Sequence, residues 1–237
     1  MKQALLGLLL VANTAMASTV VYEFKNKNTY VLKKVEGQKT YENLKASTVT
    51  TQVGNGVATS SDTPNFDSDL LILDFSGDYE DGVVNLKAKA EVDFMNDLDQ
   101  QMQTDDTVGQ IVYRTVVRPF IKFFLLDTLA DGTTSVSDAG KVTITSDAPL
   151  RAEVKTSFFY KHKLKSLKVD AEEVARVLGT QLSKEAQLNT ILKRIASGGE
   201  FSDISVVNVQ ASDLECRAKG DNLNCEFESQ VRVEVAY

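Results

Sequence analysis

Long stretches in which apolar and polar residues alternate constrain the fold of this chain most strongly. One runs from Val84 to Phe94, where every second residue is apolar, and the same period recurs in Ala152–Leu164 and Phe227–Tyr237. Successive side chains of a strand point to opposite faces of a sheet. The pattern therefore predicts long antiparallel strands with one apolar face and one solvent-facing face.

Shorter segments add to this sheet, and a polar stretch interrupts it. Further strand candidates are Val20–Phe24, Tyr30–Val35, Ser47–Val53, Leu70–Phe75 and Lys141–Thr145. Residues 54–69 are rich in Ser, Thr, Asn, Asp and Gly. This composition is typical of a long loop.

Two segments favour helices. Asp170 and Glu173 form a capping-box pattern ahead of apolar residues at helical spacing, with Gly179 as a point where this helix could divide. Residues 107–130 fit two structures, because 111–117 have strong strand propensity while both ends resemble helix ends. We favour a helix there, kinked at Pro119.

The only two cysteines, Cys216 and Cys225, predict a disulfide across a hairpin. With Gly220-Asp221 as a type II′ turn, counting outward places the cysteines opposite each other at a non-hydrogen-bonded pair. The Cα atoms come closest at such pairs, within the range of a disulfide.

A change of phase precedes this hairpin. Val207, Val209 and Ala211 are apolar on odd numbers, whereas Leu214 and Cys216 are apolar on even ones. A one-residue bulge near Ser212-Asp213 would return all five to one face. The opposite face then gathers the acidic residues Asp213, Glu215, Glu226 and Glu228. Because like charges across a strand pair repel, the sequence predicts a compensating partner nearby.

The N-terminal segment, residues 1–17, is typical of a secretory signal peptide. Lys2 precedes an apolar run from Ala4 to Ala12, and Ala15-Met16-Ala17 offers small residues for cleavage before Ser18. The run is too short to span a bilayer. We therefore expect an exported protein, periplasmic or secreted, in a compartment that permits the disulfide.

The charge balance narrows the range of partners. The chain has 26 basic and 33 acidic residues, a net charge of −7. An acidic protein is a poor partner for nucleic acid, and we expect no such binding. No stretch after Ala17 has the length and apolarity of a transmembrane helix.

One candidate site is basic, formed by Lys161, Lys163, Lys165 and Lys168. Alternation places the first three on the solvent face of a strand, where they could attract an anionic ligand or an acidic partner. The alternative is a solvated strand face that lies beside the acidic hairpin and offsets its repulsion.

A second candidate site is apolar, formed by Phe120, Ile121, Phe123 and Phe124. Arg114, Arg118 and Lys122 recur every fourth residue beside it. The segment could therefore lie in a membrane interface or cover an apolar ligand. The alternative is that these residues simply belong to the core.

The sequence contains few residues or motifs that would indicate catalysis or cofactor binding. His162 is the only histidine, and neither a glycine-rich phosphate loop nor zinc-ligand spacing occurs. We therefore assign no catalytic residue, metal or cofactor. The acidic cluster around Asp78, Glu80 and Asp81 lacks the EF-hand spacing and is interpreted as a solvated turn.

Together these patterns predict an α+β, β-rich domain over residues 18–237, with a subdivision conceivable near residue 140. A long antiparallel sheet, which could be strongly curved, is covered by one or two helices and ends in the disulfide-linked hairpin.

For function, the sequence favours an exported non-catalytic binding protein that holds a lipid or other apolar ligand between sheet and helices. The first alternative is a structural or interaction protein that binds other envelope proteins. Further alternatives are an outer-membrane β-barrel and a carboxylate-dependent hydrolase. An enclosed apolar cavity would favour the carrier, and a filled core with an exposed apolar patch would favour the interaction protein.

Overall fold

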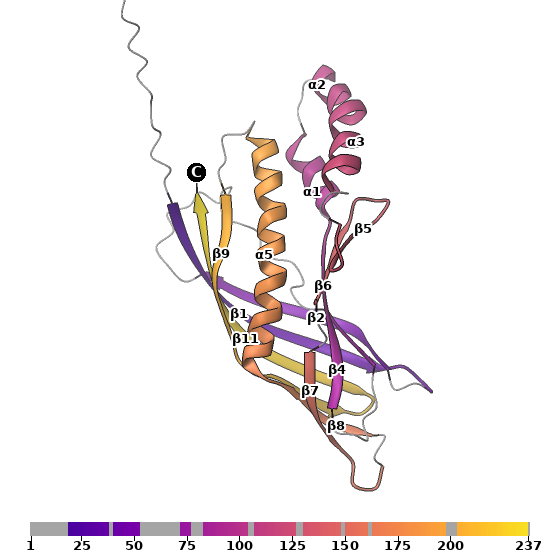
Figure 1. Ribbon diagram of the computed structural model, residues 1–237. Helices are drawn as coiled ribbons and strands as arrows, with labels where there is room; N and C mark the ends of the chain where they lie inside the picture. Colours follow the sequence, from indigo (N-terminus) through magenta and orange to yellow (C-terminus); the bar gives the residue numbers. More distant parts are fainter. Residues whose placement is uncertain are drawn as a thin grey trace, which may run out of the picture.

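The computed structural model describes residues 19–37, 40–52, 72–76, 83–103, 107–126, 130–147, 150–160, 163–197 and 203–236. Within these residues, eleven strands form one sheet in which every pairing is antiparallel, and helices lie against one side of it and beyond its edge (Figure 1). The predicted β-rich α+β class with a long, curved antiparallel sheet is confirmed.

The strands are β1 (Thr19–Lys34), β2 (Thr40–Gln52), β3 (Ile72–Ser76), β4 (Val83–Val92), β5 (Thr134–Val136), β6 (Val142–Thr145), β7 (Leu150–Thr156), β8 (Leu164–Val169), β9 (Asp203–Ala211), β10 (Leu214–Lys219) and β11 (Asn222–Ala236). The helices are α1 (Phe94–Gln101), α2 (Thr107–Val112), η1 (Tyr113–Val117), α3 (Arg118–Phe120), η2 (Ile121–Leu126) and α5 (Ala171–Ala196), where η marks π-helical turns.

The strand order explains the curvature of the sheet. It runs β3-β2-β1-β11-β10-β8-β7-β4-β6-β5, and β9 pairs with β11 as well. Because β3 pairs with both β2 and β4, the strands β3, β2, β1, β11, β10, β8, β7 and β4 form a closed ring. The apolar faces of these strands therefore point toward one another rather than to solvent.

The central pair β1–β11 shows how the alternating sequence specifies this packing. Every odd-numbered residue from Leu223 to Val235 is buried, and so is every even-numbered residue from Tyr22 to Leu32. These faces join the inner side of α5 in one large core cluster. Three polar residues, Asn26, Asn28 and Ser229, also lie on the buried face, where both asparagine amides donate to the Ser229 hydroxyl at 3.5 Å.

The disulfide hairpin has the predicted register. Cys216 lies opposite Cys225, their Cα atoms are 3.9 Å apart, and the two are joined by a disulfide. Gly220 has a φ of 65°, whereas Asp221 has no positive φ. This combination is the one that a type II′ turn with glycine first requires.

The predicted bulge near Ser212-Asp213 is confirmed, and the β9–β11 pairing contains a second one. Ala211 pairs with Ser229 but Glu215 pairs with Glu226, so one extra residue lies between them. A further shift lies at Val207. This second bulge turns Val207 outward, where it is half exposed, so its expected place on the apolar face was wrong.

Helix α5 agrees with the predicted start but not with the predicted division. The Asp170 carboxylate caps it by accepting from the Glu172 backbone N–H at 2.8 Å. Such a side-chain cap satisfies a backbone donor that the helix itself leaves free. Gly179 does not divide the helix, which is continuous for 26 residues. A Cβ at Gly179 would lie 3.7 Å from a methyl group of Val209 in β9, an ordinary contact distance, so the position has room for a methyl group.

The sequence predicted one strand over the alternating stretch Ala152–Leu164, and this prediction was wrong. The stretch contributes to the two strands of the β7–β8 hairpin, with residues 157–160 and 163 of its turn between them in the described part of the chain. The Ser157 N–H donates to the Lys163 carbonyl at 2.9 Å, which closes this turn. Alternation misled here because a period of two does not mark where a strand leaves its sheet.

Residues 107–126 are helical, as favoured, and are called the arm below. The arm projects beyond the sheet next to α1 (Figure 1). π-helical turns lie on both sides of Pro119. Proline lacks the N–H of a regular helix, and such turns accommodate its absence. Among the helices of the described residues, none is long and apolar enough to cross a membrane.

A second core cluster holds the base of the arm. Phe94, Met95 and Leu98 of α1 pack there with residues of β4, β6 and the arm. The C-terminal half of α5 contributes Leu188 and Leu192 to the same cluster, while its N-terminal half packs on the main sheet. Helix α5 thus connects the two core clusters.

Candidate interaction surfaces

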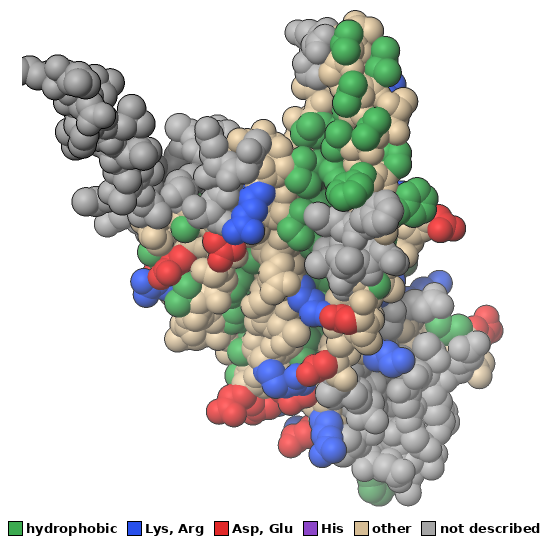
Figure 2. Space-filling model, turned by 45° about the horizontal axis from the view of Figure 1, so that its top comes forward, with side chains coloured by type: hydrophobic (Ala, Val, Ile, Leu, Met, Phe, Trp, Pro, Cys, Tyr) green, Lys and Arg blue, Asp and Glu red, His purple; other side chains and the backbone are tan. Residues whose placement is uncertain are grey.

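The arm carries a large group of exposed apolar side chains. Between 48% and 68% of the surface of each is exposed, and they are Val108, Ile111, Val112, Val116, Phe120 and Phe123. Figure 2 shows hydrophobic side chains gathered over the projecting part of the molecule. Soluble monomers rarely expose so many neighbouring apolar side chains, so the surface of the arm indicates a contact site.

The arm's mixed helical geometry arranges its residues in stripes. A π-turn holds more residues than an α-turn, so in this mixture residues four apart lie nearly along one line. Val108, Val112, Val116 and Phe120 form one exposed apolar stripe. Ile111 and Phe123 lie on the adjacent stripe of the arm. A broad part of the helix surface is therefore apolar and exposed.

Positive charge lies beside the apolar surface. Arg114, Arg118 and Lys122 occupy a third stripe, and residues 107–126 contain no acidic residue. The Lys122 ammonium group lies 5.3 Å from the centre of the Phe123 ring. This separation is within the range of a cation–π contact. The arm is therefore a cationic amphipathic element in a chain of net negative charge.

An ion pair fastens the arm to α1. The Arg118 guanidinium donates to both oxygens of Asp99, at 2.8 Å from Nε and 3.0 Å from Nη2. The Tyr113 hydroxyl donates to the same carboxylate at 2.6 Å. The bonds from Arg118, and secondarily that from Tyr113, hold the pKa of Asp99 below its ordinary value. Burial, followed by the bond to Asp99, raises the pKa of Tyr113.

The four residues of the apolar candidate do not lie together. Phe120 and Phe123 are exposed on the arm, whereas Ile121 is buried in the second core cluster. Ile121 therefore packs at the base of the arm and is not exposed on its surface, and its contact with an apolar ligand stays a prediction. The side chain of Phe124 lies outside the described residues.

Sequence reasoning missed four further exposed apolar residues of the arm, namely Val108, Ile111, Val112 and Val116. The spacing of four between Val108, Val112 and Val116 matches that of the cationic residues, and this shared spacing is the signal that could have found these three.

The basic candidate is divided as well. Lys161 and His162 lie outside the described residues, while Lys163 and Lys165 are exposed at the base of the β7–β8 turn. Lys168 pairs with Asp213 at 2.5 Å. The pair raises the pKa of Lys168 and lowers that of Asp213.

Lys168 also offsets the acidic hairpin. It lies opposite Glu215 in the neighbouring strand, and Glu215 in turn faces Glu226. The Arg217 guanidinium contacts Glu215 at 3.0 Å, adding a second positive charge. For Lys168 the structure thus supports the interpretation as a partner of the acidic strands.

Three consecutive aromatic residues form the turn of the β7–β8 hairpin. Phe158 and Phe159 are 87% and 84% exposed, and Tyr160 is 59% exposed. The alternating pattern had predicted a strand for this segment. Aromatic residues favour strands, so no local sequence signal marked this turn.

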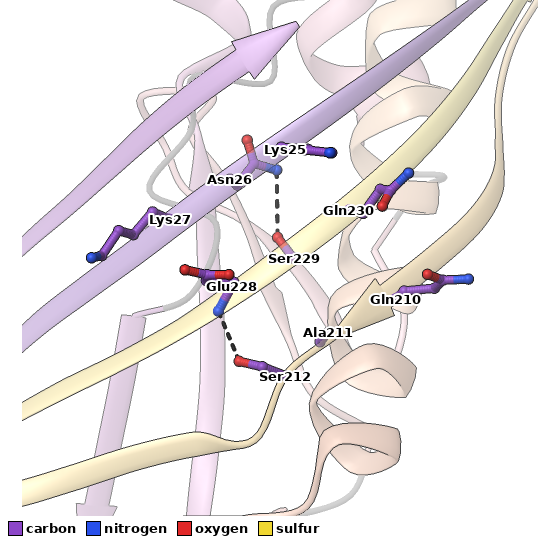
Figure 3. Close-up of a pocket in the computed structure, with 9 residues that line it drawn as sticks. All are labelled: Lys25, Asn26, Lys27, Gln210, Ala211, Ser212, Glu228, Ser229 and Gln230. Atoms are coloured by element: carbon purple, nitrogen blue, oxygen red, sulfur yellow. Dashed lines mark hydrogen bonds between the residues drawn. The ribbon is translucent and has the colours of Figure 1, made fainter. Parts of the chain in front are cut away.

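Pockets among the described residues are open to solvent. One of about 530 Å³ lies where the bulge parts β9 from β11, and Figure 3 shows the residues that line it. The Ser212 hydroxyl accepts from the Glu228 N–H at 2.9 Å there, and the Asn26 amide donates to Ser229. Lys25 and Lys27 also line it. No arrangement of nucleophile and base appears among the residues that line this pocket.

A second open depression, of about 810 Å³, lies between α5 and β9. It is lined by polar side chains of α5, including Arg176 and Lys184, and by the bulged segment 206–209. The space between the sheet and α5 is filled by packed side chains such as Phe24, Leu178 and Leu182. Neither depression is an enclosed apolar cavity.

Metal binding has no candidate in the described part of the chain. No group of three or more His, Cys, Asp or Glu residues there could hold an ion. The acidic cluster around Asp78, Glu80 and Asp81 lies outside the described residues.

Comparisons with known proteins do not assign a family. Neither family models, nor curated proteins, nor solved structures give a match. The surfaces described above are therefore the basis for inferring a function.

Proposed function

We propose that this protein is an extracytoplasmic, non-catalytic binding protein that attaches to anionic lipid surfaces through its arm. The observation that carries the proposal is the group of six exposed apolar side chains on a projecting helix without acidic residues. Interfacial helices have this composition: an apolar face that enters the headgroup boundary and cations that attract lipid phosphates.

The location outside the cytoplasm rests on two features. The disulfide between Cys216 and Cys225 fits an oxidising compartment. The signal peptide, with cleavage after Ala17, is the sequence-based part of the proposal, because residues 1–17 lie outside the described residues.

The charge distribution predicts how the protein would approach a membrane. A net charge of −7 repels an anionic surface, while Arg114 and Lys122 supply local attraction beside the apolar stripes. The arm should therefore set the orientation of binding, and salt should weaken it. The apolar ligand expected between sheet and helix stays a prediction.

Vesicle flotation tests the proposal directly. The wild-type protein should float with vesicles of zwitterionic lipid mixed with phosphatidylglycerol, and less with purely zwitterionic vesicles. Val116→Ser/Phe120→Ser should weaken flotation about tenfold or more, because each buried apolar side chain is worth roughly 1.5–3 kcal/mol. Both residues are exposed, so the variant should fold normally.

A matched control removes apolar surface elsewhere. Leu44→Ser/Val207→Ser changes two exposed apolar residues outside the arm and should float like the wild type. If the arm variant floats as well as this control, the proposal is wrong. The wild type could instead fail to float with vesicles and sediment as an oligomer, while the arm variant sediments as a monomer. The arm would then mediate self-association, which is the structural alternative.

A further inference from the structure

The β7–β8 turn, here called the aromatic tip (residues 157–160 and 163), lies at the opposite end of the molecule from the arm (Figure 1). Its aromatic residues are Phe158, Phe159 and Tyr160, with Phe158 and Phe159 more than four-fifths exposed. An isolated apolar residue on a surface needs no explanation, but three adjoining aromatic residues at a turn do.

The tip is held in shape by its own contacts. The Ser157 N–H donates to the Lys163 carbonyl at 2.9 Å, and the Lys163 N–H donates to the Tyr160 carbonyl at 2.8 Å. The rings of Phe158 and Phe159 meet edge to face, with centroids 5.3 Å apart. Aromatic pairs favour this arrangement. These contacts keep the rings at the apex of the hairpin and leave them exposed to an occupant.

The charge around the tip favours an anionic occupant. Residues 154–169 contain five lysines and no acidic residue, within a chain of net charge −7. Of these lysines, Lys163 is exposed in the tip itself, and Lys155 and Lys165 are exposed in the two strands next to it. Electrostatic complementarity therefore favours a negatively charged surface over a neutral one.

The shape and size of the tip favour a bilayer over a protein. Three aromatic side chains bury roughly 450–750 Å² in total. A standard protein interface covers about 800 Å² on each partner. A convex aromatic apex next to lysines instead suits the headgroup region, where aromatic rings are favoured and lysines reach phosphates.

We propose that the aromatic tip inserts into an anionic bilayer and that the molecule bridges two lipid surfaces, one at the tip and one at the arm. The tip contact stands on its own observations, whereas bridging rests on the proposed function of the arm. Because the two sites lie at opposite ends, they would engage different membranes and not one membrane together.

A two-vesicle capture assay tests this inference. Phosphatidylglycerol-containing vesicles are held on beads, and capture of free, dye-filled vesicles of the same lipid is measured with full-length protein. Wild type should capture vesicles, and Phe158→Ser/Phe159→Ser should reduce capture at least tenfold. Flotation of this variant should stay within about twofold, because the arm, with six exposed apolar side chains against three at the tip, is the larger lipid contact. Leu44→Ser/Val207→Ser is the matched control and should capture like wild type.

The outcomes separate the two proposals. Wild-type protein that floats without capturing vesicles, or a tip variant that captures normally, overturns the tip inference and leaves the arm proposal standing. If the tip variant loses flotation while the arm variant Val116→Ser/Phe120→Ser keeps it, the arm proposal and bridging are overturned. That result would support lipid contact at the tip. Absence of any flotation by the wild type overturns both.

Discussion

Single residues determine how closely the chain can pack beneath the arm, and Gly140 is the clearest case. Its φ of +81° lies in the left-handed region, and a Cβ there would overlap the Cβ and Cγ of Met95. Met95 belongs to α1 and is buried in the core cluster that holds the base of the arm. Glycine is thus required both for the backbone conformation and for contact with α1.

We therefore expect Gly140→Ala to lower the free energy of unfolding by about 2–5 kcal/mol, from left-handed strain plus overpacking. Gly220→Ala is the matched control, because Gly220 has φ +65° but open space where a methyl group would stand. It should cost only the strain, about 1–2 kcal/mol. Equal losses of the two variants in denaturant titrations would show that Met95 does not crowd Gly140.

At the scale of elements, the arm depends on its attachment to α1 through Asp99. The pKa of Asp99 is held below its ordinary value, primarily by Arg118. The ionised form is therefore the one that favours the docked arm. Its contribution is complete above the ordinary carboxyl pKa, near 3.8, and is lost as pH falls through the lower pKa of the folded protein.

Asp99→Asn should accordingly raise hydrogen exchange in residues 107–123 at pH 7. It should lower the free energy of unfolding by only about 1 kcal/mol, because solvent screens a pair whose partners are both more than one-third exposed. The difference from wild type should be constant from about pH 7 to about pH 5 and shrink as the pH falls below the ordinary carboxyl pKa.

Asp97→Asn on the same helix is the control for this experiment. Burial and then Asp93 raise the pKa of Asp97, so the charge of Asp97 does not favour the fold. If the Asp97 and Asp99 variants behave alike, Asp99 does not hold the arm.

The elements also show what the sequence could predict. The disulfide register and the bulge at Ser212-Asp213 followed from local rules, because turn type and side-chain period fix which residues face each other. The bulge at Val207 and the end of β7 depend on neighbouring strands, so no local pattern marks them. Likewise the helical spacing of 107–126 was visible, but the burial of Ile121 and exposure of Val116 depend on which side of the arm faces α1.

At the scale of the whole molecule, the sheet and α5 form a filled scaffold that separates two exposed apolar surfaces (Figure 1). Both surfaces lie in segments without acidic residues, whereas the chain as a whole is acidic. This arrangement would direct the molecule to lipid by its ends and keep its sides in solution. The proposed attachment and bridging both depend on entry of the arm into a lipid interface.

Fluorescence at the arm is the sharpest test of that entry, because the chain has no tryptophan and a single Phe120→Trp provides an unmixed signal. Phe120 is 58% exposed, so its tryptophan should emit at long wavelength in solution. With phosphatidylglycerol vesicles we predict a shift to shorter wavelength and quenching by brominated lipid, neither of which Val207→Trp should show. Unchanged emission of Phe120→Trp at saturating lipid would mean that the arm does not enter the membrane.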